Sequence, residues 1–168
     1  MSEAEVSAPV RLDSSHERSV FDCGTESLND WFRSRALNNE RSGASRTYVA
    51  CEGPTVVGYY CLSSTHVVRV DAPKPVRCNA PDPIPATLMG RLAVDQRLQG
   101  RGLGKLLVRD AILRVLSAGE IVGTSLLVVD AISNDASRFY AQQGFLESAT
   151  HPLTLYLPLA PLRARLAN

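Results

Sequence analysis

A glycine-rich turn between an apolar strand pattern and a helical pattern constrains this chain more than any other feature. The strand pattern ends at Val94, and DQRLQGRGLGK then leads into a helix expected from about Gly102 to Ala118. Three glycines stand within five positions of the turn, at Gly100, Gly102 and Gly104. Glycine lets the main chain approach a ligand without a Cβ in the way, and N–H groups at a helix N-terminus attract anions. The turn therefore predicts an anion site.

Two common phosphate-binding motifs do not fit this turn. The Rossmann pattern GxGxxG lacks its third glycine, and the Walker pattern fails because Lys105 is not preceded by GxxxxG and is followed by Leu106. The pattern Q-x-x-G-x-G does fit, as Gln99-Gly100-Arg101-Gly102-Leu103-Gly104.

The rest of the chain shows strand and helix patterns of ordinary length. The segments 46–53 and 55–70 are rich in β-branched and aromatic residues and are separated at Gly53 and Pro54, which predicts an antiparallel hairpin. Further strands are expected at 9–13, 86–94, 124–131 and within 153–159, and a short helix at 135–143. Residues 71–85 hold five prolines in fifteen positions, so we expect a loop there, placed to lie over a site, and neither a helix nor a central strand.

An additional helix is expected before the hairpin. Its apolar stripe consists of Leu28, Trp31, Phe32 and Leu37. Thr25 or Ser27 can cap its start and Gly43 can end it. On the opposite face, Arg33, Arg35 and Arg41 are expected to point to solvent. No repeat or linker is visible, so the sequence predicts one α/β (α+β) domain over residues 1–168.

Composition excludes several classes of protein. Apolar residues make up 45% and charged residues 21% of the 168 positions, which is typical of a globular chain and not of a disordered one. No apolar run is long enough to span a bilayer and the first thirty residues lack a signal-peptide pattern, which predicts a cytoplasmic protein without a membrane partner. The four cysteines form no CxxC pair and the three histidines lack metal-ligand spacing, so we expect reduced, structural thiols and no metal.

Charge is unevenly distributed along the chain. From Arg33 to Arg109 there are twelve basic and five acidic residues, whereas the remainder carries six basic and twelve acidic ones. Sixteen of the eighteen basic residues are arginine, whose planar guanidinium binds phosphate bidentately. The basic middle indicates either a solvated face in an arginine-rich chain or a phosphate-rich partner.

The loop and its surroundings resemble the GCN5-related N-acetyltransferase (GNAT) superfamily. In that family such a loop joins a strand to a helix, an apolar strand follows, and a later helix carries a tyrosine before a Gly-Phe pair, here Tyr140 and Gly144-Phe145. The resemblance implies a GNAT fold, with a mixed, mostly antiparallel central sheet that is flanked by helices and splayed after Val94. It also implies acetyl-CoA as co-substrate and direct transfer of acetyl to an amine.

The same resemblance implies roles for individual residues. Tyr140 would donate a proton to the departing thiolate, and the main-chain N–H of Val94 would hydrogen-bond to the thioester oxygen. The implied coenzyme contacts are Leu92, Ala93, Val94, Gln99, Gly100, Arg101, Gly102, Leu103, Gly104, Lys105, Ser133 and Phe139. Ser133 stands where the family often has asparagine.

The strand before the loop departs from the family pattern. Many relatives carry a glutamate there as general base, but TLMGRLAV has no carboxylate. An α-amine with a pKa of about 8 is partly neutral near pH 7, unlike a lysine amine with a pKa of about 10.4, so the missing base favours an α-amine acceptor. Glu52, Asp130 or a chain of waters remain alternative bases.

A narrower resemblance lies in FDCGTESLNDWF, residues 21–32, with the arginine-rich segment after it. This string is similar to the acetyltransferase toxins of bacterial type II toxin-antitoxin systems. The resemblance implies acetylation of the α-amine of aminoacyl-tRNA, a block of translation, and a ribbon-helix-helix antitoxin encoded nearby. It also suggests a tRNA-binding surface made of Arg33, Arg35, Arg41, Arg46, Arg77 and Arg91.

Two alternatives stay open. The chain could be a GNAT that acetylates a protein N-terminus or a small-molecule amine, or an acyl-CoA-binding module that partners a DNA-binding protein without catalysis. The sequence also leaves open a homodimer and the identity of the preferred aminoacyl-tRNA.

Overall fold

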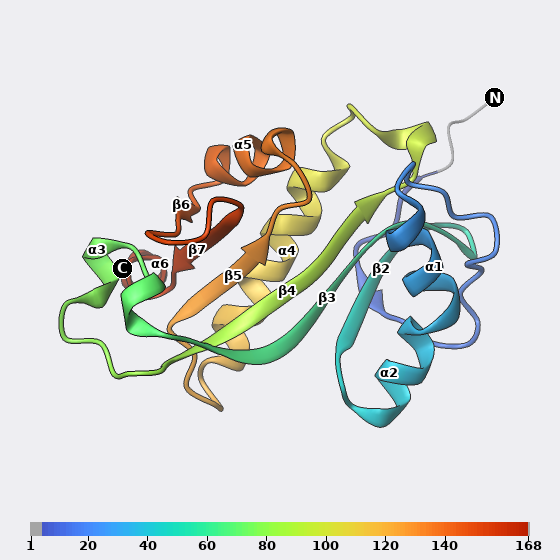
Figure 1. The fold of residues 1–168 in the computed structure, drawn as a ribbon. Helices are drawn as coiled ribbons and strands as arrows, with labels where there is room; N and C mark the ends of the chain where they lie inside the picture. The colour runs from blue at the N-terminus through green and yellow to red at the C-terminus, as the bar shows by residue number, and fades with distance from the viewer. Residues whose placement is uncertain (1–4, 168) are drawn as a thin grey trace. The chain divides into compact units, whose positions relative to one another are not determined.

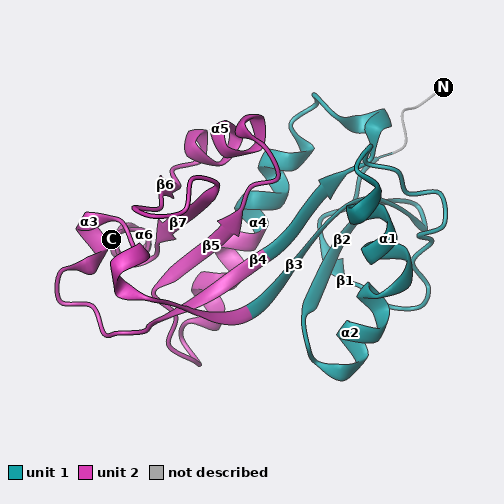
Figure 2. Cartoon of the chain, viewed as in Figure 1, with its two compact units in different colours: residues 1–63, 90–110 teal, residues 64–89, 111–168 magenta. Residues whose placement is uncertain are grey.

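The computed structural model describes residues 5–167. The chain divides into two compact units, drawn in teal and magenta in Figure 2. Unit 1 consists of the chain up to Ser63 and of Gly90–Asp110, and unit 2 consists of Ser64–Met89 and the chain from Ala111 onward. Three elements contribute residues to both units: β3 (Thr55–Val67), β4 (Ile84–Val94) and α4 (Leu103–Ala118).

The remaining elements belong to one unit each. Unit 1 holds β1 (Val10–Arg11), α1 (Glu26–Ser34), α2 (Ala36–Ser42), β2 (Arg46–Glu52) and the short 3-10 helix η2 (Gln96–Leu98). Unit 2 holds η1 (Arg69–Asp71), α3 (Lys74–Arg77), β5 (Leu126–Asp130), α5 (Asn134–Gln142), β6 (Leu146–Glu147), β7 (Thr154–Pro158) and α6 (Ala160–Leu166).

The strands hydrogen-bond in the order β1-β2-β3-β4-β5-β7-β6 (Figure 1). The pairs β1–β2, β2–β3, β5–β7 and β6–β7 are antiparallel. The pair β4–β5 is parallel and joins Ala86–Met89 to Leu126–Val129. The mixed, mostly antiparallel sheet predicted from the sequence is confirmed.

The hairpin is also confirmed. Arg46 stands opposite Leu62 at its open end and Glu52 opposite Thr55 at its turn, with a register shift between Ala50 and Cys51. Gly53 has φ of 58°, a left-handed value that suits the tight turns joining twisted antiparallel strands.

The helix expected before the hairpin is broken in two at Arg35. In a continuous helix with 3.6 residues per turn, Leu37 would lie nine residues from Leu28 and therefore on the opposite side. The break between α1 and α2 lets both leucines pack against one apolar cluster. Thr25 occupies the N-cap position of α1 without a side-chain capping bond, and Gly43 ends α2 with φ of 80°, as expected.

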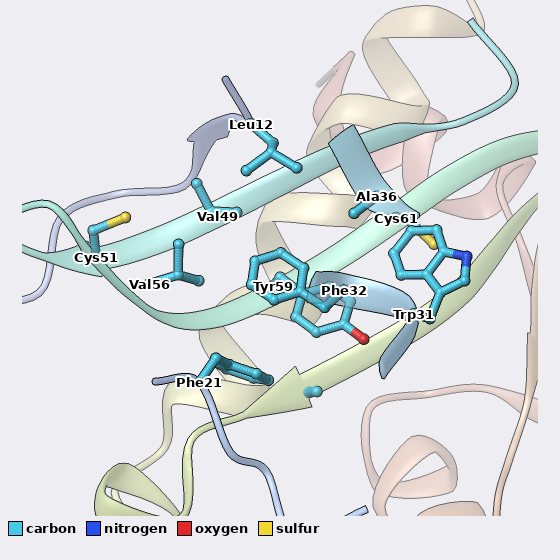
Figure 3. Packing of buried hydrophobic residues seen from close by; sticks show 11 residues of the cluster. Leu12, Phe21, Trp31, Phe32, Ala36, Val49, Cys51, Val56, Tyr59 and Cys61 are labelled. Atoms are coloured by element: carbon cyan, nitrogen blue, oxygen red, sulfur yellow. The ribbon is translucent and has the colours of Figure 1, made fainter. Parts of the chain in front are cut away.

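Figure 3 shows this cluster, the core of unit 1. The rings of Phe32 and Tyr59 stack with centroids 4.2 Å apart, and Phe21 meets them edge-on at 5.1 and 5.4 Å. All three side chains are fully buried. Such aromatic pairs add about 0.5–1.5 kcal/mol each beyond burial, so they fix α1 and the segment before it against β3.

The core of unit 2 covers one face of its strands. Alternate residues of a strand point to the same face, and Ala86 of β4, Leu126 and Val128 of β5 and Tyr156 of β7 meet in one buried cluster. Ala72 belongs to the cluster, and Val76 and Ala80 pack against it. The proline-rich segment therefore lies over this face of the sheet.

Several short elements differ from the sequence-based prediction, among them η1, which takes the place of the strand end expected at Arg69 and Val70. Residues 71–85 contain the one-turn helix α3, with Pro75 in its first turn, where the fixed φ of proline suits a helix and no N–H is needed. Strand β6 has two residues and was not expected. Helix α6 was missed as well; Pro161 stands in its first turn.

Candidate functional site

The glycine-rich turn forms an open loop in unit 1. It runs from the end of β4 at Val94 through η2 to the start of α4 at Leu103. Gly100 and Gly102 have φ of 80° and 85°, values that strongly favour glycine. A Cβ added to either would meet no atom within 4 Å. The space into which a side chain would project is therefore open at both positions, beside a helix start of the kind that attracts anions.

The first turns of α4 lie close against β3 within unit 1. A Cβ added to Gly58 would stand 3.1 Å from Cδ1 of Leu107 and 3.3 Å from Cδ2 of Leu103. Both leucines are buried. Glycine at this position of β3 thus allows the helix that follows the loop to pack tightly on the strand.

The predicted coenzyme contacts around this loop differ in exposure. Gly100, Arg101, Gly102, Gln99 and Lys105 are exposed; Leu92, Val94 and Gly104 are half-buried; Ala93 and Leu103 are buried. The side chain of Gln99 donates from Nε2 to the carbonyls of Val94 and Cys23, both at 2.9 Å. The side-chain amide of Gln99 therefore binds to main-chain carbonyls of the protein and holds the loop in place. Coenzyme contacts by these residues stay predictions.

Helix α5 in unit 2 carries the other predicted coenzyme and catalytic residues. Ser133 is its N-cap, and its hydroxyl accepts a hydrogen bond from the N–H of Ala136 at 3.1 Å. This bond satisfies one of the free N–H groups at the helix start. Serine therefore has a structural role at the position where the family often has asparagine.

Tyr140 is buried in α5, with 8% of its surface exposed. Its ring meets those of Phe139 and Phe145 edge-on, with centroids 5.2 and 5.6 Å away. Burial raises the pKa of the Tyr140 hydroxyl to about 12. The hydroxyl therefore keeps its proton throughout the physiological range, as a proton donor must.

Unit 2 also contains a cavity of about 340 Å³. Its apolar lining consists of Val67, Leu88, Val128 and Tyr156, which belong to the sheet cluster described above or pack against it, and of Val68 just after β3. Its polar lining consists of Thr65, His66, Asp71, Asp130, His151 and Thr154. The cavity thus combines an apolar floor with two carboxylates and two imidazoles, which suits a ligand with an apolar body and a cationic or amine end.

Hydrogen bonds hold the polar side of this cavity in place. Asp130 accepts from the hydroxyl of Thr154 at 2.7 Å. Asp71 accepts from the hydroxyl of Thr150 at 2.6 Å and lies 3.4 Å from Nε2 of His151. Sequence reasoning named Asp130 as an alternative base but gave no role to Asp71 or His151. Asp71 ends η1, Asp130 ends β5 and His151 precedes β7, and no spacing along the chain brings them together.

The arginines expected to bind tRNA differ in their partners. Arg33 was expected to point to solvent but is half-buried, and its guanidinium donates to the carbonyl of Phe21. The guanidinium carbon of Arg91 lies 4.3 Å from the ring centroid of Trp31, a cation–π contact. Arg46 donates to the carbonyl of Glu40 at 2.9 Å.

The other three members of this set are placed differently. Arg35, between α1 and α2, and Arg41 of α2 are exposed in unit 1. Arg77 of α3 is half-buried in unit 2. Arg35 and Arg41 are therefore the members best placed to meet phosphates, while a role in tRNA binding stays a prediction for all six.

All four cysteines are free thiols. Cys51 and Cys61 are buried, Cys23 is half-buried, and burial raises the pKa of each of these thiols. Cys78 is exposed, so the expectation of structural thiols is wrong for this residue. Within residues 5–167, no group of three or more histidine, cysteine or acidic side chains could hold a metal ion, and no helix could cross a membrane.

The chain is similar to known acetyltransferases. Residues 43–147 match the family model described as an acetyltransferase (GNAT) domain. The chain is 43% identical to a tRNA-acetylating toxin of Mycobacterium tuberculosis over 162 residues, which cover 96% of this chain and 98% of the relative.

Solved structures are similar over almost the whole chain. One is AtaT complexed with acetyl-methionyl-tRNAfMet, with 30% identity, a TM-score of 0.89, and coverage of 96% of this chain and 99% of that one. Another is a tyrosine-to-phenylalanine mutant of AtaT bound to the C-terminus of the antitoxin AtaR and acetyl-CoA, with 28% identity, a TM-score of 0.82, and coverage of 97% and 99%. The family model, the loop and the sheet agree: this chain belongs to the GNAT acetyltransferases, enzymes that use acetyl-CoA.

Proposed function

We propose that this acetyltransferase is a tRNA-acetylating toxin, which moves the acetyl group of acetyl-CoA onto the α-amine of an aminoacyl-tRNA and so blocks translation. The observation that carries the proposal is the 43% identity with the mycobacterial tRNA-acetylating toxin along 96% of this chain. That similarity spans the N-terminal FDCG segment as well as the glycine-rich loop. A generic coenzyme-binding domain would need to share only the loop.

The loop is suited to the coenzyme. The space beside Gly100 and Gly102 is open at the start of α4, and the free N–H groups of a helix start can donate to a diphosphate. The coenzyme supplies a thioester whose carbonyl carbon an amine can attack. We assign its contacts to the loop from Leu92 to Lys105, and we propose Ser133 and Phe139 as further contacts from the family resemblance.

The transfer exchanges one bond to the acetyl carbon for another. The amine nitrogen bonds to the carbonyl carbon, the bond from that carbon to sulfur breaks, and the thiolate takes a proton. We assign this proton to Tyr140, which regains one from solvent, and the hydrogen bond to the thioester oxygen to the N–H of Val94. We assign the removal of the amine's protons to Asp130, which passes them to solvent: an α-ammonium group gives up one proton before it attacks, and the nitrogen gives up a second as the bond to sulfur breaks. No covalent bond to the enzyme forms.

We assign the aminoacyl end of the acceptor to the cavity in unit 2. Its apolar floor suits an uncharged amino-acid side chain, and Asp71 and Asp130 attract the α-ammonium group. An aminoacyl ester carries no carboxylate that these two acids would repel. This chemistry favours an aminoacyl group over a free amino acid.

The partners and setting follow from the same proposal. The similar toxin AtaT binds the C-terminus of the antitoxin AtaR. We propose that this chain likewise pairs with an antitoxin, of the ribbon-helix-helix type, and that both proteins act in the cytoplasm. A homodimer is compatible with the proposal and is not required by it. We also propose that residues 1–168 act as one acetyltransferase domain, because β3, β4 and α4 each supply residues to both units.

One labelled-acetyl assay tests the function. The acceptors are charged tRNA, uncharged tRNA, free amino acids and a lysine peptide, each incubated with acetyl-CoA carrying a radiolabelled acetyl group. We expect label on charged tRNA, at the α-amine, and none on uncharged tRNA. Label on the lysine peptide but not on charged tRNA would replace the toxin assignment with that of another amine acetyltransferase, and no turnover at all would indicate a binding module.

The exposed arginines give a second prediction. The double variant Arg35→Gln/Arg41→Gln should raise KM for aminoacyl-tRNA with little change in acetyl-CoA affinity. The dependence of tRNA binding on salt should fall by about one unit of slope for each phosphate that the variant no longer neutralises. Arg165→Gln, at an exposed arginine of α6, is the matched control and should change neither quantity. An unchanged salt slope in the double variant would show that these two arginines do not contact tRNA.

A further inference from the structure

A tight turn precedes α1 in unit 1. The carboxylate of Asp22 accepts from the N–H of Gly24 at 2.9 Å and from Nδ2 of Asn29 at 3.0 Å. Oδ1 of Asn29 accepts from the N–H of Cys23 at 2.9 Å. The bond from Gly24, and after it the bond from Asn29, lowers the pKa of Asp22, so the acceptor is a charged carboxylate. Asn29, with 1% of its surface exposed, thus holds the turn Asp22–Gly24 in shape from the first turn of α1.

The same turn is bonded to the segment that opens the coenzyme loop. The N–H of Gln96 donates to the carbonyl of Asp22 at 2.9 Å, and the N–H of Asp22 donates to Oδ2 of Asp95 at 3.2 Å. Nε2 of Gln99 donates to the carbonyls of Cys23 and Val94. Three hydrogen bonds therefore join the turn to residues 95–99.

Asp95 is the centre of this connection. It is buried, with 2% of its surface exposed, and its Oδ1 accepts from the N–H and from Nε of Arg97, both at 3.0 Å. Its own N–H donates to the carbonyl of Val57 in β3 at 2.8 Å. A buried carboxylate needs such partners, so a shift of the turn would leave Asp95 short of one of them.

Close packing adds to the hydrogen bonds. Gly24 has φ of 88°, and a Cβ added there would lie 2.5 Å from Nε2 of Gln96. A side chain at position 24 would therefore strain the backbone of the turn and displace the exposed amide of Gln96. This accounts for Asp22, Gly24 and Asn29 of the FDCGTESLN string without any contact with a substrate.

We propose that the turn Asp22–Gly24, held by Asn29, is a brace that sets the position of residues 95–99 and hence of the acetyl-CoA loop from Gly100 to Gly104. Asp22 and Asn29 are then positioning residues for the coenzyme and not for the acceptor. The inference rests on the coenzyme site proposed above and is independent of which amine is acetylated.

The test measures acetyl-CoA affinity by calorimetry without any acceptor, and then the steady-state constants. Asn29→Ala should raise the Kd for acetyl-CoA by about tenfold or more. The rate at saturating acetyl-CoA and the KM for the acceptor should stay within about threefold of the wild type. Asp22→Ala, at an exposed side chain that is not assigned to the coenzyme, removes the bonds to Gly24 and Asn29 and gives a second variant if Asn29→Ala does not fold.

Two comparisons separate a brace from general damage to unit 1. Tyr59→Phe removes the hydrogen bond from the buried Tyr59 hydroxyl to the carbonyl of Leu28, next to Asn29, but leaves the turn intact. It should leave acetyl-CoA affinity within twofold. The double variant Asp22→Ala/Asn29→Ala should lose less affinity than the product of the single losses, because both act through the same brace.

Several results would overturn the inference. One is a folded Asn29→Ala protein with wild-type acetyl-CoA affinity while Gly102→Val loses it. A second is a loss of acetyl-CoA affinity in Tyr59→Phe as large as that in Asn29→Ala. A third is a loss of affinity in the double variant equal to the product of the two single losses. If Gly102→Val also keeps wild-type affinity for acetyl-CoA, the coenzyme does not bind at the proposed loop. The proposed coenzyme site is then wrong, whatever the turn Asp22–Gly24 does. Failure of tRNA as an acceptor would leave all of these measurements unaffected.

Discussion

The Tyr140→Phe enzyme is expected to transfer acetyl groups about 100-fold more slowly than the wild type, or slower still, the scale of a lost general acid. The substitution removes the hydroxyl and keeps the ring, which packs edge-on against Phe139 and Phe145. The fold and acetyl-CoA binding should therefore survive. Single-turnover transfer of labelled acetyl to aminoacyl-tRNA measures the rate, and calorimetry measures the coenzyme affinity.

Tyr59→Phe is the matched control, because it removes the hydroxyl of another buried tyrosine. Its transfer rate should equal that of the wild type. The pH dependence gives a further check. A general acid works while it is protonated, and with a pKa of about 12 the Tyr140 hydroxyl loses its proton only well above pH 10. A wild-type transfer rate in Tyr140→Phe would contradict the assigned role.

Gly102→Val is expected to reduce acetyl-CoA binding below detection by calorimetry. Gly102 has φ of 85°, where a β-branched residue is a severe outlier, and left-handed backbone costs a non-glycine residue about 1–2 kcal/mol. The added side chain would also occupy the open space next to the loop, where the coenzyme diphosphate is expected. Strain and obstruction act in the same direction, so the loss should be large.

Gly123→Val controls for the substitution itself. Gly123 precedes β5, is exposed, and has no atom within 4 Å of an added Cβ. Its variant should bind acetyl-CoA like the wild type. Circular dichroism and thermal unfolding of both variants distinguish a lost site from a lost fold. Unchanged acetyl-CoA affinity in a folded Gly102→Val protein would place the coenzyme elsewhere.

The sequence predicted those parts of the fold that depend on local pattern. The glycine spacing at Gly100 and Gly102 and the hairpin at Gly53 each need a backbone conformation that few residue types adopt, so sequence alone identifies them. The break at Arg35 was missed because it serves the packing of Leu37, and the apolar stripe was interpreted as one helix. The one-turn helix α3 was missed because a count of prolines does not say where in a helix they stand.

The candidate site was predictable to a smaller extent. Motif similarity points to single residues such as Tyr140, but the cavity in unit 2 assembles Leu88, Val128 and His151 from distant segments. Charge counting has the same weakness, since it treats Arg33 and Arg35 alike. Their partners differ: Arg33 donates to the carbonyl of Phe21, and Arg35 is exposed. Partners of this kind depend on the folded arrangement and leave no pattern in the sequence.

The distribution of the four thiols makes the unmodified chain suitable for fluorescence work. The thiolate is the reactive form of cysteine, and burial raises the pKa of Cys23, Cys51 and Cys61, which slows their reaction. Cys78 is exposed and directly follows α3, in the segment that lies over the sheet face of unit 2. A maleimide dye should therefore attach at one site without any engineered cysteine. That dye would sit on the segment that supplies Asp71 to the cavity, where its emission can report on acceptor binding in real time.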